Sequence, residues 1–143
     1  MEIHVNWLSV FVAALAHFML GWAWYSALFQ DSWMKEMGLK KKSKKEMEKA
    51  MKGMPKAMAI NFATLVVMAW VLCHIIHMSA NMFQMPGLVT GLKTGFFVWL
   101  GFFATTLVNS VLWESRSWKL YSINVGYHFV GLLLMGAILG VWK

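Results

Sequence analysis

Long apolar runs alternate with short polar segments along the chain. Four apolar runs account for most of it: Val5 to Phe29, Ala57 to Ser79, Leu88 to Trp113 and Leu120 to Trp142. Each is close to the ~20 residues that a helix needs to cross a bilayer core. None shows the period-two alternation of strands, and in lipid only helices or a closed barrel satisfy every backbone amide. The pattern predicts an all-α, polytopic membrane protein with four transmembrane helices in a single domain, residues 1–143.

No charged residue separates the second apolar run from the third. The uncharged stretch from Ala57 to Leu92 would be far too long for one crossing. Ser79, Asn81, Pro86 and Gly87 interrupt it with residue types that favour turns. We therefore expect an outgoing helix, a turn and a returning helix.

The composition supports this class and adds an orientation. The chain is 59% hydrophobic and only 13% charged, which is unusual for a soluble domain. Of its 13 lysines and arginines, nine lie between the first two helices, and Arg116 and Lys119 lie between the third and fourth. The positive-inside rule places these loops in the cytoplasm and both termini outside. Because no soluble module carries the basic patch, we expect no nucleic-acid partner.

The basic loop, residues 30–56, contains the signals of an amphipathic cytoplasmic helix. Ser43 and Glu46 have the spacing of a capping box. An apolar stripe follows at three- and four-residue intervals: Met47, Ala50, Met51, Met54 and Met58. On the inner leaflet, Lys40 to Lys56 would attract anionic lipid headgroups by ~1 kcal/mol per lysine. The alternative is a solvated loop whose apolar stripe merely caps the bundle.

Polar side chains recur inside the apolar runs. At 100° per residue, those of the third and of the fourth helix each fall on one face, and most lie in the cytoplasmic half. The predicted intramembrane cluster comprises His17, Asn61, Thr64, Thr105, Asn109, Asn124, Tyr127 and His128. Its predicted mouth at the inner surface comprises Trp24, Tyr25, Ser26, Glu114 and Arg116. The alternative is that each polar side chain only joins helices by hydrogen bonds worth ~0.6–2 kcal/mol.

Two histidines near the outer end of the second helix form a second candidate site. His74 and His77 are three residues apart, so they are neighbours on a helix surface. Imidazole and thioether donors suit Cu(I), and imidazoles suit Zn(II). A metal site needs three or four converging ligands, however, and the nearby methionines are equally typical of apolar filler. No bound cofactor is predicted.

Small residues predict close helix contacts. Gly91 and Gly95 on the third helix, and Gly136 and Gly140 on the fourth, have the spacing that lets helix backbones approach. A four-helix bundle leaves little room for a substrate path within one protomer. We therefore expect a homo-oligomer.

Several stretches resemble a known family. They are "NWLSVFVAALAHFMLGWAWYSALF", the following "SWM" with Gly38, and "GFFATTLVNSVLWESRSWKLYSINVGYHFVGLLLMGAILGVWK". The chain is similar over nearly its full length to small bacterial membrane proteins grouped as domain of unknown function 1761. The resemblance implies a four-helix domain in a bacterial inner (plasma) membrane and implies no activity. The family favours proline after Trp-Tyr-Ser, where this chain has Ala27, so a bend there is not implied.

Three classes of function remain open. The first is an oligomeric channel or transporter lined by the polar cluster, whose flux should change between about pH 5 and 8 because histidine titrates there. The second is a non-catalytic accessory or lipid-organising protein that acts through Lys40 to Lys56. The third is a lipid-active enzyme that uses Glu114 and His128. The sequence contains no HExxH, GxSxG, P-loop or dinucleotide-binding pattern, which argues against the common enzyme classes.

Overall fold

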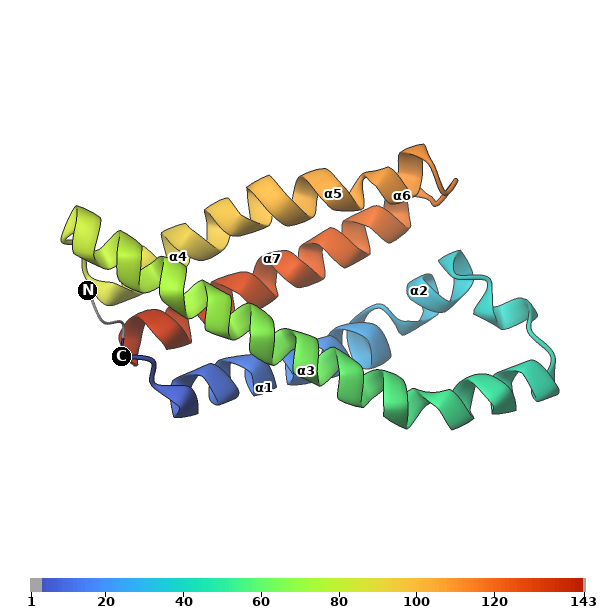
Figure 1. The fold of residues 1–143 in the computed structure, drawn as a ribbon. Helices are drawn as coiled ribbons and strands as arrows, with labels where there is room; N and C mark the ends of the chain where they lie inside the picture. Colours follow the sequence, from blue (N-terminus) through green and yellow to red (C-terminus); the bar gives the residue numbers. More distant parts are fainter. Residues whose placement is uncertain (1–3, 143) are drawn as a thin grey trace.

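The computed structural model describes residues 4–142 and contains only helices and short connections over that range. Its helices form four long antiparallel rods, and α1 begins and α7 ends at the same end of the bundle (Figure 1). The first rod is α1 (Trp7–Ala23) with η1 (Trp24–Leu28), the second is α3 (Lys44–Phe83), the third is α4 (Gly87–Val98) with η3 (Trp99–Ala104), α5 (Thr105–Leu107) and α6 (Asn109–Leu112), and the fourth is α7 (Trp118–Val141). Between the first two rods lie α2 (Gln30–Glu36) and η2 (Leu39–Lys41).

Four helical segments among the described residues are long and apolar enough to cross a membrane: Trp7–Leu28, Lys44–Phe83, Gly87–Leu112 and Trp118–Val141. The predicted helical class and number of spans agree with this result. We call the end with the α3–α4 turn the turn end, and the end with α2, η2 and the loop before α7 the basic end. Figure 1 shows these two ends on opposite sides of the bundle.

The helix α3 is longer than the sequence predicts. An amphipathic helix after Ser43 and a separate span from Ala57 were expected, but the structure has one helix of 40 residues with Pro55 inside it. At 1.5 Å per residue it is about 60 Å long, roughly twice the bilayer core. Pro55 removes a single backbone donor, and the neighbouring alanine, methionine and lysine residues favour helix. The polar segment therefore continues directly into the membrane-spanning segment.

Local signals set both ends of α3. The capping box is present: the Ser43 hydroxyl accepts from the Glu46 N–H at 3.4 Å, and the Ser43 N–H donates to the Glu46 carboxylate at 2.9 Å. The helix passes Ser79 and ends only at Phe83, later than the turn residues predict. Gln84 adopts the left-handed conformation, with φ of 52°, and Pro86 disfavours helical geometry in the residue before it.

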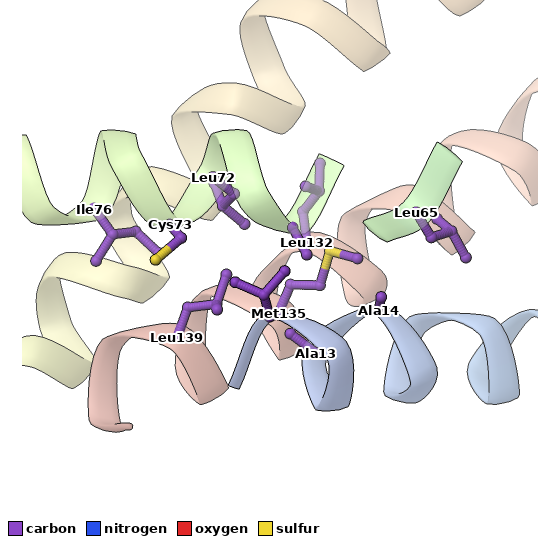
Figure 2. Close-up of a cluster of buried hydrophobic side chains, with 11 residues drawn as sticks. Ala13, Ala14, Leu65, Leu72, Cys73, Ile76, Leu132, Met135 and Leu139 are labelled. Atoms are coloured by element: carbon purple, nitrogen blue, oxygen red, sulfur yellow. The ribbon is translucent and has the colours of Figure 1, made fainter. Parts of the chain in front are cut away.

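The apolar core lies between α1, α3 and α7. It consists of Val10, Ala13, Ala14, Leu65, Ala69, Leu72, Cys73, Ile76, Leu132, Met135 and Leu139. In Figure 2 the side chain of Met135 points between α1 and α3, close to Leu132 and Ala13. All of these side chains are at most 2% exposed. The half of the bundle toward the turn end is therefore closely filled.

Glycines allow α4 and α7 to meet backbone to backbone. A Cβ at Gly91 would lie 1.9 Å from the carbonyl oxygen of Gly136, and one at Gly95 would lie 2.5 Å from that of Leu132. Gly140 likewise lies against the backbone of Gly87: a Cβ at Gly140 would lie 2.2 Å from the carbonyl oxygen of Gly87. The two small-residue patterns thus contact each other within one chain. Because these surfaces are already occupied, a homo-oligomer would have to use other surfaces.

Candidate functional site

Two membrane-spanning rods contain a π-helical segment within the described part of the chain. These segments are η1 and η3, and π-helical turns within α-helices are frequent at functional sites. Each begins with a tryptophan that donates to a backbone carbonyl of α7. The Trp24 indole N–H lies 3.0 Å from the oxygen of Ile123, and the Trp99 indole N–H lies 2.9 Å from the oxygen of Val125. The two tryptophans hold α7 on either side of Asn124.

Next to these contacts, α1, η1 and α7 bring five polar side chains together. The Tyr25 hydroxyl donates to the Asn124 side-chain oxygen at 2.8 Å, and the Tyr25 and Tyr127 rings are 5.2 Å apart. The Tyr127 ring lies 4.8 Å from His17 and 4.8 Å from His128, and the two histidine rings are 5.8 Å apart. We call these five residues the aromatic cluster. Four of them belong to the predicted intramembrane set, and Tyr25 belongs to the predicted mouth.

His17 lies at the buried side of the aromatic cluster. Its side chain is fully buried, its Nδ1 lies 3.4 Å from the sulfur of Met135, and its Nε2 has no hydrogen-bond partner within residues 4–142. A Cβ at Gly131 would lie only 2.2 Å from that Nε2, so the glycine provides the space for the ring. His128 stacks on Phe103 with ring centroids 4.5 Å apart, and its Nδ1 also lacks a partner in the described part of the chain.

A cavity of about 720 Å³ lies beside the aromatic cluster, and we call it the chamber. It is lined by Phe18, Gly21, Trp22, Tyr25, Ser26, Gln30, Trp33, Met34, Leu39, Met47, Ala50, Met51, Met54, Met58, Asn61, Tyr127 and His128. Its inner side, formed by α1, η1 and α7, is mainly aromatic. Its outer side, formed by α2, η2 and α3, is rich in methionine. No aspartate, glutamate, lysine or arginine belongs to this described lining.

A shallow surface depression adjoins the chamber along the first half of α3, and we call it the lysine hollow. Lys42, Glu46 and Lys49 line it, together with Gly53 and Ala57, and it shares Ala50 and Met54 with the chamber. The Glu46 carboxylate already accepts from the backbone of Ser43. Because the two hollows share Ala50 and Met54, the border between them is apolar, and the charged side chains lie just beyond it.

Three other predicted cluster residues lie apart from the five, whereas Asn61 lines the chamber. Thr64 donates to the backbone oxygen of Asn61, and Thr105 donates to that of Gly101; both threonines are exposed. Asn109 is exposed as well. At 100° per residue Thr105 and Asn109 would share a face with the glycines of α4, but the wider turns of η3 advance each residue by a smaller angle. Residues after η3 therefore face a different direction from Gly91 and Gly95 before it.

The predicted mouth residues also divide into two groups. Tyr25 and Ser26 line the chamber, and Trp24 faces α7 through the hydrogen bond described above. Glu114 and Arg116 are exposed in the loop before α7 and do not belong to the chamber lining. This loop ends where α7 begins at Trp118, and His128 lies ten residues further along α7, which is about 15 Å of helix rise away from the loop.

The His74 and His77 rings bond to their own helix. The Nδ1 of His74 lies 2.8 Å from the backbone oxygen of Trp70, and the Nδ1 of His77 lies 2.8 Å from that of Cys73. No group of three or more His, Cys, Asp or Glu side chains converges within residues 4–142. The metal hypothesis therefore gains no third ligand of these types from the fold.

Several residues of this region were not identified from the sequence as parts of a site. The sequence places the methionine stripe of α3 either at the membrane surface or as a cap on the bundle, and in the structure it forms a chamber wall. Gly131 shares the predicted polar face of the fourth helix with Asn124, Tyr127 and His128. Trp99 carries no local signal of its role, because it acts on a residue of another helix. Only the spacing of aromatic residues on facing helices could have indicated it.

The four candidate spans define the class as a multi-pass membrane protein, and its helices enclose a cavity lined by polar and aromatic side chains. A family model described as "Protein of unknown function (DUF1761)" matches residues 8–140. The chain therefore belongs to the DUF1761 family, as its resemblance indicated. No curated protein and no solved structure matches the chain.

Proposed function

We propose that this protein is a membrane carrier that binds a small amphipathic molecule in the chamber and exposes it alternately to the two sides of the membrane. One observation carries the proposal: the chamber reaches Tyr127 and His128 from the basic end, and beyond them the bundle is filled by the buried core. A permanently open channel through one protomer would need space there. A closed floor instead fits one state of an alternating carrier.

The irregular helices support the same interpretation. Transporters commonly interrupt membrane helices at the substrate site, where the protein can satisfy the freed backbone groups. Here η1 contributes Tyr25 and Ser26 to the chamber, and η3 starts at the tryptophan that contacts α7. Both interruptions are therefore beside the proposed binding site.

Thiol labelling from each side of the membrane tests the proposal without knowledge of the substrate. The natural Cys73 is 1% exposed, so the unmodified chain serves as the unlabelled background. An Asn61→Cys variant has its thiol in the chamber, and a Thr64→Cys variant has it on the same helix outside the chamber. A membrane-impermeant maleimide should label Asn61→Cys from the basic end and, more slowly, from the turn end.

Labelling of Asn61→Cys from the basic end alone would contradict alternating access. The protein would then bind a ligand in the chamber without carrying it across the membrane. Thr64→Cys serves as the control outside the chamber. Like other lipid-facing positions, its thiol should react little with the impermeant maleimide, and equally little in either vesicle orientation. Opposite vesicle orientations also determine which end of the bundle faces the cytoplasm, which we propose is the basic end in a bacterial inner membrane.

A lipid-organising role through Lys40 to Lys56 is the second candidate. Residues 48–61 of α3 are all exposed, so the basic part of this helix can meet a lipid surface. Replacement of these lysines by glutamine should abolish binding to anionic vesicles and leave the bundle folded. An unchanged vesicle affinity would refute this role. The enzyme hypothesis has no comparable support, because Glu114 lies outside the chamber.

A further inference from the structure

The walls of the chamber suit a flexible hydrocarbon group. Five methionines, from α2 and α3, line the outer side, and the aromatic rings of Phe18 and Trp22 line the inner side. Methionine adapts to ligands of irregular shape and contacts aromatic and apolar groups favourably. The volume of about 720 Å³ is within the usual range for pockets that enclose drug-sized molecules.

The hydroxyl groups at the floor of the chamber need no hydrogen bonds from a ligand, and the one unpartnered polar atom described there is the Nδ1 of His128. The Tyr25 hydroxyl already donates to Asn124, the Tyr127 hydroxyl donates to the backbone oxygen of His17 at 3.4 Å, and the Ser26 hydroxyl donates to that of Trp22. An apolar chain end can therefore lie against these rings without leaving their hydroxyl donors unsatisfied.

The charges at the edge of the chamber favour an anion. Lys42 and Lys49 lie in the lysine hollow, and neither forms an ion pair within residues 4–142. Lys40, by contrast, is 3.5 Å from Asp31. A charged head would lose much hydration at the chamber floor, whereas at the lysine hollow it stays near water and opposite charge.

We propose that the chamber binds a single-chain anionic amphiphile, with its hydrocarbon part between the methionine and aromatic walls and its anionic head at Lys42 and Lys49. This assignment rests on the proposed function and names the ligand class of its site. At the lysine hollow a cationic head would meet two ammonium groups and the single carboxylate of Glu46, which already accepts from the backbone of Ser43, so the net charge there favours an anion.

Photolabelling in nanodiscs of zwitterionic lipid tests this assignment on the full chain. The probes share one diazirine-bearing chain and differ only in the head: a carboxylate, a primary alcohol or a trimethylammonium group. Mass spectrometry should locate the label between Met47 and Met58 and at Tyr127. The concentration for half-maximal labelling should be about tenfold lower for the carboxylate than for the alcohol, and the cation should label least.

Paired variants separate the chamber from the surface. Ala50→Trp fills the chamber and should remove the label, whereas Ala63→Trp, exposed on α3 outside the chamber, should retain it. Lys42→Gln combined with Lys49→Gln should abolish the preference for the carboxylate. Lys45→Gln combined with Lys52→Gln removes the same charge outside both hollows and should preserve that preference.

Each contrary result has a distinct meaning. Chamber labelling that ignores head charge, or an equal effect of the two lysine pairs, would overturn the anionic assignment while the carrier proposal stands. Displacement of the probe by a two-chain anionic phospholipid would overturn the single-chain assignment. Labelling that is unaffected by Ala50→Trp would overturn binding in the chamber and with it the carrier's proposed site.

Discussion

The two ends of the bundle are built from different side chains and have different consequences. Toward the turn end, Gly91 and Gly136 bring α4 and α7 into backbone contact, and Leu72, Ile76 and Leu139 fill the adjoining core. Toward the basic end, aromatic rings, methionines and the π-helical segment η1 surround the chamber, and η3 packs against α7 beside it. Apolar helices thus close on each other where side chains are small or aliphatic. Large rings and irregular turns keep them apart.

The largest effect is expected at the closed end. A Gly91→Val variant would force side-chain atoms into the backbone of Gly136, so the unfolding free energy should fall by about 3 kcal/mol or more. Cys73, the single cysteine, is 1% exposed, so a thiol-reactive fluorophore reports opening of the core during heating. Gly53→Ala is the control, because a Cβ there meets nothing within 4 Å. It should stabilise the exposed part of α3 locally, by about 0.5–1 kcal/mol, and should leave the melting temperature reported by Cys73 unchanged. Equal melting of both variants would contradict the tight contact.

A smaller effect is expected where the two ends join. Gly131→Ala would press against the His17 ring and should lower stability by about 1–3 kcal/mol. The double variant Gly131→Ala with His17→Ala removes the clash, so it should be more stable than the sum of the two single changes predicts. Thermal melts of the four chains measure this coupling. Strict additivity would show that the ring does not depend on the glycine.

At the open end, the tryptophan contacts should each contribute about 1 kcal/mol. Trp24→Phe and Trp99→Phe each remove an indole donor to α7 but keep an aromatic ring. Both variants should have lower melting temperatures. When each is combined with Asn61→Cys, the thiol in the chamber should react faster with maleimide, because α7 is held less firmly. Trp113→Phe, at a side chain that is 82% exposed, should match the unmodified chain. An identical response of all three variants would remove the proposed role of the π-helical segments.

The smallest effect is expected at the start of α3. Ser43→Ala removes the capping hydroxyl, at a local cost of about 1 kcal/mol. Because residues 48–61 are all exposed, amide exchange should quicken over the first turns of α3 alone. The melting temperature reported by Cys73 should not change. A lower melting temperature would show that the basic segment and the core unfold together.

Sequence reasoning recovered part of the candidate site. His17, Asn124, Tyr127 and His128 do meet, because each lies on a regular helix where a constant angle per residue holds. Thr105 and Asn109 follow η3, where the angle per residue changes. No sequence pattern predicts the π-helical turns there, so the direction of these two side chains could not be predicted from the sequence. The methionine stripe was visible, but its partner surface on α1 and α7 was not.

The sequence by itself determined the four apolar helices, the capping box at Ser43 and the turn before Gly87, because hydropathy and capping depend on neighbours along the chain. Tertiary structure alone decided that Gly91 meets Gly136 inside one protomer, that α3 continues through Pro55, and that the methionines of α3 form a chamber wall. These outcomes depend on which helix faces which. Space between helices is a property of their packing and cannot be read from any one of them.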